Sequence, residues 1–269
     1  MLNGMIFQDV LYGIKKSKGK YIGFLFFMIA IVLGKCFLLR QIEYGDFGLF
    51  GILGSDSIRG IATYIPASDN QINIPAYWII MLLFIPFILG DYCEEDMKGT
   101  GLYKIILSGR KKWWLSKFIW ICVSCVIYLL IFYGTQFILT AIFNNGIIKP
   151  DEEVLLHVFG YSDMLMDKVE FFCYMVLAPS LCFMTFFIWS GIIGMIIGSV
   201  NAFTIITIYV VLGIFNTSPY LIGNQLMLLR SSYFEPQGLI MENSIVIDLI
   251  LIVGGFLVGN SYIQNKNFV

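Results

Sequence analysis

Long apolar stretches separated by short polar segments dominate the chain. The hydrocarbon core of a bilayer is about 30 Å thick, so a helix that crosses it needs about 20 mainly apolar residues. Six stretches approach or reach that length, at 21–39, 76–93, 118–143, 171–197, 202–215 and 245–258. The pattern predicts an all-α integral membrane protein with six transmembrane helices, in which residues 21–269 form a single transmembrane domain.

The first 20 residues have a different pattern, in which apolar residues recur at roughly helical spacing and lysines follow them. The apolar residues are Met5, Ile6, Val10, Leu11 and Ile14, and the lysines are Lys15, Lys16, Lys18 and Lys20. This combination predicts an amphipathic interfacial helix over residues 1–20, with its lysines near anionic lipid head groups. The alternative is a frayed cytoplasmic tail.

The segment 216–244, before the last predicted span, is partly apolar but is interrupted by proline and glycine. The interruptions are Pro219, Gly223, Pro236 and Gly238. No apolar run in it is long enough to cross a bilayer. We therefore expect short re-entrant or outer-leaflet helices here.

Lysine and arginine gather on one side of the predicted spans. Four lysines precede the first span, six basic residues lie between the second and third, and one lysine follows the sixth. The loop between the third and fourth spans is rich in acids instead: Asp151, Glu152, Glu153, Asp163, Asp167 and Glu170. The positive-inside rule places the basic side in the cytoplasm. We expect a multi-pass protein of a bacterial plasma membrane with both termini cytoplasmic.

Composition and motifs exclude several classes of protein. Hydrophobic residues make up 58% of the chain and charged residues 13%, whereas soluble domains carry about 25% charged residues. The net charge of −1 gives no reason to expect a nucleic-acid partner. The chain has no G-x-x-x-x-G-K-[ST] or H-E-x-x-H motif, and its single histidine, His157, allows no histidine-based triad. We expect no catalytic, cofactor-binding or metal-binding residue and no enzymatic activity.

Six cysteines are present, and two of them, Cys122 and Cys125, form a C-x-x-C. This pair lies inside a long apolar stretch, with no second pair and no nearby histidine. Small apolar packing is therefore a better interpretation of these thiols than a metal or redox site.

Three charged residues fall close to the predicted membrane interior: Lys35, Asp91 and Asp248. A buried acid in a membrane helix is a functional candidate by default. An interfacial position, with Lys35 snorkelling toward the outer surface, is the alternative for all three. Small residues recur at helix-packing spacing in the last part of the chain, at Gly255 and Gly259, and predict close helix contacts there.

The loop between the second and third predicted spans has the most distinctive sequence, GDYCEEDMKGTGLYKIILSGRKKWWLSKF over residues 90–118. Acids come first, then a Gly-Thr break, then a short amphipathic piece that ends in Ser-Gly and a basic run. An acid-first, base-last order suits the dipole of a short helix. A compact cytoplasmic helix between two spans is what a membrane domain needs to receive force from a soluble motor.

This loop resembles that of the membrane permease subunits of type-2 ABC transporters, the exporter family. The shared order is an acid, Gly-Thr, leucine-like residues, a Ser-x-basic turn and a lysine that enters the third span. The matching residues are Glu95, Gly99, Thr100, Ile106, Leu107, Ser108, Arg110 and Lys117. The resemblance implies that the loop 94–117 couples the chain to an ATPase. The coupling residues it implies are Glu94, Glu95, Asp96, Gly99, Thr100, Leu107, Ser108 and Arg110.

The resemblance also implies partners that this chain lacks. ATP and magnesium would bind a soluble ABC ATPase subunit, and a second permease subunit, identical or different, would complete the transporter in membrane lipid. Small permeases of this kind resemble those of antimicrobial-peptide export or immunity, so a peptide, an antibiotic or an amphipathic, lipid-like cargo is expected. The alternative is a non-transporting polytopic membrane protein, such as an assembly or sensor scaffold. Charge reversal at Glu95 together with Asp96 is expected to weaken assembly with the ATPase.

Overall fold

The computed structural model describes residues 2–41, 76–90, 92–97, 100–143, 169, 172–227, 230–232 and 237–266. These residues are mostly helical, and their only β-pairing is an isolated bridge between Ser231 and Leu239. The prediction of an all-α fold is confirmed for this part of the chain. The predicted outer loops, 41–75 and 144–170, lie almost wholly outside it.

Four helices in the described part are long and apolar enough to cross a membrane. They are α1 (Leu2–Gln41), α6 (Arg110–Phe143), α9 (Ala178–Ile197), which follows the π-helical turn η1 (Cys173–Leu177), and α11 (Met241–Asn265). Each of them corresponds to one predicted span. Their length and composition agree with a membrane protein.

The other two predicted spans correspond to shorter apolar helices. Helix α3 (Ala76–Leu89) has 14 residues and α10 (Ser199–Phe215) has 17. At 1.5 Å per residue they are about 21 and 26 Å long, against about 30 Å for the bilayer core. That these two helices cross the membrane, giving six spans, stays a prediction.

Helix α1 is unbroken, so the predicted interfacial helix 1–20 and the first predicted span are one element. A stripe of buried positions runs along it at intervals of three or four residues, as expected for one face of a helix. The stripe consists of Asp9, Gly13, Ser17, Tyr21, Phe24, Met28, Val32 and Cys36. It packs mainly against α6, and this continuous partner explains why the helix has no break near residue 20. That residues 2–20 lie along a membrane surface stays a prediction.

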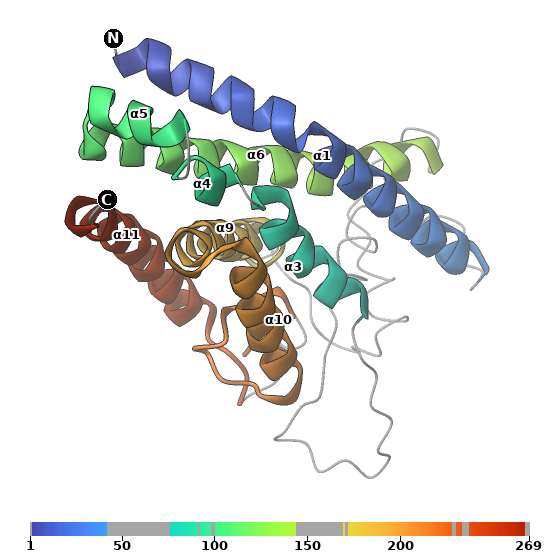
Figure 1. Cartoon of the computed structure of the whole chain (residues 1–269). Coiled ribbons are helices and arrows are strands. Elements are labelled where there is room, and N and C mark those ends of the chain that lie inside the picture. Colours follow the sequence, from blue (N-terminus) through green and yellow to red (C-terminus); the bar gives the residue numbers. More distant parts are fainter. Residues whose placement is uncertain are drawn as a thin grey trace.

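Helix α9 occupies the centre of the bundle, where it packs against α3, α6, α10 and α11 (Figure 1). Aromatic side chains hold this centre together. The ring of Tyr128 in α6 stacks on Phe24 of α1 at 4.1 Å and lies 5.2 Å from Phe183 of α9. Its hydroxyl donates to the carbonyl of Met81 in α3 at 2.9 Å. One buried tyrosine thus joins four helices, with its polar atom satisfied.

The glycines of α11 allow close helix contacts, as their spacing predicts. A Cβ at Gly255 would lie 2.5 Å from the side chain of Ile188 in α9, and one at Gly259 would lie 2.3 Å from Trp114 in α6. The predicted close packing is confirmed at these two positions.

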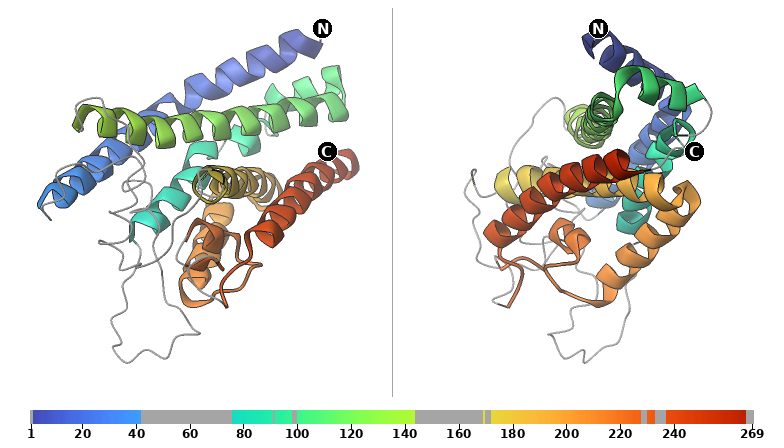
Figure 2. Two further views of the ribbon diagram at one scale, coloured as in Figure 1. Left: turned by 180° about the vertical axis from the view of Figure 1, so that it is seen from behind. Right: turned by 60° about the vertical axis from the view of Figure 1, so that its left-hand side comes forward.

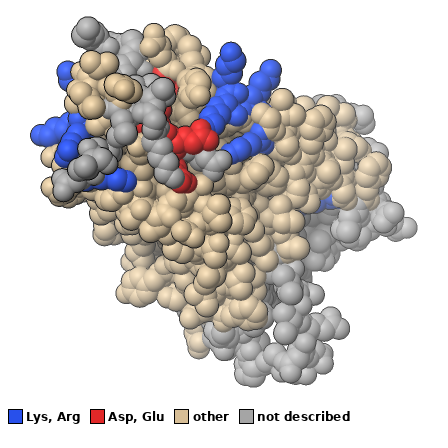
Figure 3. Space-filling view, in the orientation of Figure 1, with Lys and Arg blue, Asp and Glu red and all other residues tan. Residues whose placement is uncertain are grey.

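Both chain termini and the connection from α3 to α6 lie at the same end of the molecule (Figures 1 and 2). The connection contains two short helices, α4 (Tyr92–Glu95) and α5 (Thr100–Ser108). Ser17 of α1 donates to the carbonyl of Ile88 near the end of α3 at 3.2 Å, and Arg110 of α6 donates to the carbonyl of Gln264 in α11. On the face shown in Figure 3, charged side chains gather at this end of the molecule, hereafter the charged end. Which side of a membrane it occupies stays a prediction.

Arg230, which the sequence analysis did not single out, caps the C-terminal end of α10. Its buried guanidinium donates to the carbonyls of Gly213 at 2.5 Å and Ile214 at 2.8 Å, in the last turn of α10. It also donates to the side-chain oxygen of Asn224 at 2.6 Å. A cation in this place satisfies terminal carbonyls and opposes the helix dipole. Asn224 belongs to η2 (Ile222–Leu226), a single 3-10 turn within the segment where short helices are predicted.

Candidate functional site

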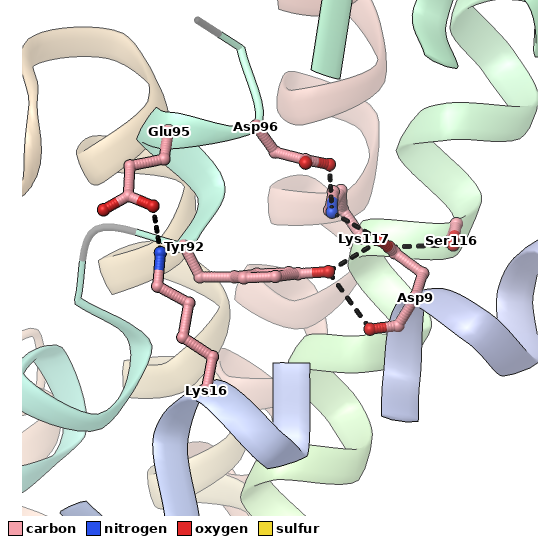
Figure 4. Close-up of polar contacts among 7 residues, drawn as sticks. All are labelled: Asp9, Lys16, Tyr92, Glu95, Asp96, Ser116 and Lys117. Carbon is pink, nitrogen blue, oxygen red and sulfur yellow. Dashed lines mark hydrogen bonds and ion pairs between the residues drawn. The ribbon is translucent and has the colours of Figure 1, made fainter. Parts of the chain in front are cut away.

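A buried ion network lies where α4 meets α1 and α6 (Figure 4). The ammonium of Lys117 in α6 is 2.8 Å from Oδ1 of Asp9 in α1 and 2.5 Å from Oδ2 of Asp96, the residue after α4. Lys117 has no exposed side-chain surface, and both carboxylates are buried as well. One lysine of α6 thus joins both α1 and the end of α4.

Two hydroxyl groups complete the network around Asp9. Tyr92 of α4 donates to Oδ1 at 2.6 Å, and Ser116 of α6 donates to Oδ2 at 3.0 Å. The ammonium of Lys117 also lies 4.0 Å from the centre of the Tyr92 ring, which is a cation–π distance. Buried ions cost free energy unless such partners satisfy them. The set of donors explains how Asp9 can be charged inside the bundle.

Glu94 ties α4 to the start of α10. Its Oε2 accepts hydrogen bonds from the backbone nitrogen of Ser199 at 2.8 Å and from the Ser199 hydroxyl at 2.9 Å. A carboxylate at a helix N-terminus is stabilised by the free backbone N–H groups and by the dipole. The turn before α10 is made by Gly198, whose φ of +92° is strained for other residues.

Glu95 forms the third tie, an ion pair with Lys16 of α1 at the surface. The side chain of Glu95 is 60% exposed, and exposed pairs of this kind contribute little stability. The run Glu94, Glu95 and Asp96 therefore attaches α4 to α10, α1 and α6 in turn. The described contacts of these acids are to the chain's own helices, while a role in contacting an ATPase stays a prediction.

Helix α5 has an inner and an outer apolar face. Ile105 is buried in the bundle, whereas Tyr103, Ile106 and Leu107 are 70%, 76% and 86% exposed. Gly109, with a φ of +83°, separates α5 from α6. These exposed apolar side chains lie at the charged end rather than on the sides of the bundle, which makes them a candidate contact surface.

The remaining predicted coupling residues are described only in part. Gly99 lies outside the described residues, and the backbone of Thr100 begins α5 while its side chain is not described. Ser108 ends α5 and is half-buried. Arg110 begins α6 and is directed toward α11, where it donates to the Gln264 carbonyl.

Of the three charged residues predicted near the membrane interior, the structure describes Lys35 and Asp248. Asp91 lies outside the described residues. The ammonium of Lys35 lies 4.7 Å from the centre of the Tyr77 ring. Asp248 is fully buried in α11 and contacts Thr185 of α9 at 3.1 Å.

Sequence reasoning missed the ion network because Asp9 lies 83 to 108 positions from its partners Tyr92, Ser116 and Lys117. Asp9 only interrupts the apolar spacing of residues 1–20, and that pattern assigns it no partner. A signal does exist, because Asp9, Gly13 and Ser17 recur every fourth residue on the face that also carries Phe24. Polar and small residues on the buried face of a helix predict a close, polar helix contact.

Within the described ranges, no three His, Cys, Asp or Glu side chains are grouped to hold a metal ion. No protein-family model, no curated protein and no solved structure matches this chain. The network, the acidic ties and the exposed face of α5 are therefore interpreted from their geometry. Polar contacts thus join the short helix α4 to α1, α6 and α10.

Proposed function

We propose that this chain is the permease subunit of an ATP-driven exporter of the ABC type, and that α5 is its contact with a soluble ATPase subunit. The observation that carries the proposal is the outer face of α5, where Tyr103, Ile106 and Leu107 are exposed at the charged end. A contact with a partner would bury this apolar surface, which is the usual reason for such a patch.

The ties of α4 support a coupling role. A force on α5 reaches the adjoining α4, and from there it reaches α10 through Glu94, α1 through Glu95, and α6 through Asp96. A ligand or partner can shift such a bundle only by binding its two arrangements differently. In this proposal the ATPase supplies that difference when it binds and hydrolyses ATP with magnesium.

The proposal includes six spans, with α3 and α10 crossing the bilayer, and both termini in the cytoplasm of a bacterial cell. Local thinning of the bilayer accommodates helices of about 21 to 26 Å at a modest cost. A second permease subunit completes the pathway for a peptide, antibiotic or lipid-like cargo.

Photo-crosslinking in the native cell tests the contact directly. A photoreactive amino acid at Leu107 is expected to capture a protein that carries G-x-x-x-x-G-K-[ST], identified by mass spectrometry. The matched control is Leu130, which is 68% exposed in the middle of α6 and is expected to capture lipid only.

Capture of lipid alone at Leu107 contradicts the proposal, because it places α5 in the head-group region. Capture of a protein without an ATP-binding motif favours the scaffold alternative instead. The orientation is tested separately by labelling a cysteine at Leu107 with a membrane-impermeant reagent. Reaction from outside intact cells contradicts a cytoplasmic α5.

A further inference from the structure

Asp248 is a fully buried acid in a long apolar helix, and the function proposed above does not use it. It lies on the face of α11 that also carries Ser244, Gly255 and Gly259 and that packs against α9 and α6. Its Oδ1 is 3.1 Å from the hydroxyl oxygen of Thr185. Its Oδ2 is buried and has no hydrogen-bond partner among the described residues.

The hydrogen atoms around Thr185 indicate which form of Asp248 fits this place. The Thr185 hydroxyl oxygen is also 3.0 Å from the carbonyl oxygen of Leu181, one turn earlier in α9. A hydroxyl carries one hydrogen, and neither a carbonyl nor a carboxylate can donate one. Each contact has its own hydrogen only when Asp248 is protonated and donates to Thr185, which in turn donates to Leu181.

The charges around Asp248 favour the neutral form as well. Its electrostatic neighbours are Cys182 of α9 and Tyr209 of α10. From η2, Gln225 approaches the carbonyl of Ser244, one turn away in α11. From α6, Trp114 packs near Gly259, almost three turns away. None of these side chains is a cation, and a carboxylate in a membrane interior without a cation is unfavourable.

A small cavity lies near the start of α11, one helical turn from Asp248, which is not itself among the lining residues. It has a volume of about 20 Å³, and Gln225, Ser231 and Ser244 are among the residues that line it. About 10–15 Å³ suffices for one water molecule. Gln225 Oε1 and Ser231 Oγ are buried there with no partner among the described residues, so a water molecule has polar groups to bind. Ser244 brings this cavity within one helical turn of Asp248.

We propose that Asp248 is a proton-binding site within the membrane domain, and that its proton latches α11 to α9. The bound proton lies on Oδ1 and is donated to Thr185, beside the hydrogen bond from Trp189 to the carbonyl of Leu251 at 3.2 Å. When the proton leaves to water in the cavity, the carboxylate has no cation, so α9 and α11 separate locally and water enters. This inference does not depend on an ATPase partner.

Infrared difference spectroscopy of the whole chain in lipid nanodiscs, titrated with pH, tests the proton site. We expect a protonated-carboxyl band that persists at neutral pH, where exposed acids are ionised, and that disappears at alkaline pH. The band is expected to be lost in Asp248→Asn and retained in Glu242→Gln, which removes an exposed carboxyl from the start of the same helix. Absence of the band from the unmodified chain at neutral pH overturns the proposal even where Asp248→Asn does not fold.

Spin labels at Leu177, at the end of η1 just before α9, and at Val246 of α11 test the latch. We expect the distance between the labels to increase at alkaline pH in the otherwise unmodified chain. In Asp248→Asn the amide donates permanently to Thr185, so the distance stays at its acidic-pH value. A distance that is independent of pH, or an equal change in Asp248→Asn, overturns the latch. A change that requires sodium ions rather than pH overturns the choice of the proton as ligand.

Discussion

Lys117 and Asp9 lie 108 positions apart in the sequence and form a 2.8 Å ion pair that joins α6 to α1 out of contact with solvent. The pair matters because Asp96, after α4, shares the same ammonium. The connection that carries α5 therefore depends on the contact between the two longest helices. Each feature of this joint leads to a testable consequence.

Replacing Lys117 by methionine leaves two buried carboxylates without their cation. Removing one partner of a buried ion network costs about 3–5 kcal/mol. We expect Lys117→Met to lower the unfolding free energy by that order, measured by chemical denaturation in detergent. Lys112→Met, at an exposed position of the same helix, is expected to change it by less than about 0.5 kcal/mol. Equal stability of the two variants would show that the network contributes nothing.

The hydroxyl of Tyr92 is separable from its ring. Tyr92→Phe removes the 2.6 Å hydrogen bond to Asp9 but keeps the ring under the Lys117 ammonium. A hydrogen bond to a charged group contributes about 1.5–3 kcal/mol, and we expect a loss of unfolding free energy in that range. Tyr92→Leu, which also removes the ring, is expected to cost more. If Tyr92→Phe is as stable as the native chain, Asp9 does not need this donor.

The two acids proposed for joint charge reversal are not equivalent. Glu95→Lys disrupts an exposed pair with Lys16, and we expect it to change stability by less than about 1 kcal/mol. Asp96→Lys brings a second cation beside Lys117 in a buried place, and we expect strong loss of folded protein in size-exclusion profiles. Reduced assembly in the double variant would therefore report folding through Asp96. Equal yields of folded protein from the two single variants would contradict this assignment.

Gly13 is required by the contact between α1 and α6. A Cβ there would lie 1.8 Å from the indole nitrogen of Trp120, whereas a Cβ at Gly19 meets nothing within 4 Å. We expect Gly13→Ala to destabilise by about 1–3 kcal/mol through overpacking. Gly19→Ala is expected to be neutral or stabilising by up to about 1 kcal/mol, because alanine is the better helix former. Thermal unfolding of the two variants in one detergent checks the difference, and a tolerated Gly13→Ala would refute the close approach.

A charge introduced at Leu107 tests whether the outer face of α5 contacts a partner. Leu107→Glu is expected to reduce co-purification with the proposed ATPase partner by about tenfold or more, since a central apolar contact contributes about 2 kcal/mol. Val200→Glu, at an exposed apolar position near the start of α10, is the control and is expected to leave the complex intact. Unchanged co-purification of folded Leu107→Glu would remove α5 from the contact.

Hydropathy predicted the long helices because a membrane helix needs a continuous apolar run, which is a local property of the sequence. The close approach of Gly255 to Ile188 followed from residue size for the same reason. Cys122 and Cys125 both lie in α6, where Cys125 is fully buried. In contrast, no local pattern reveals that Asp96 is directed inward to Lys117, because the partner comes from another helix. The acidic run was assigned to ATPase coupling by resemblance to the exporter family, which carries no information on contacts within this chain.

The unbroken course of α1 turns that helix into a lever arm. Its 40 residues are about 60 Å long at 1.5 Å per residue, which is twice the thickness of a bilayer core. Asp9 is about 28 Å along the axis from Met28, so pivoting α1 by about 10° around Met28 displaces the carboxylate by about 5 Å. A small tilt of the membrane-spanning part of α1 would thus cause a larger displacement near Asp9. Conversely, a displacement near Asp9 would cause only a small tilt of the membrane-spanning part.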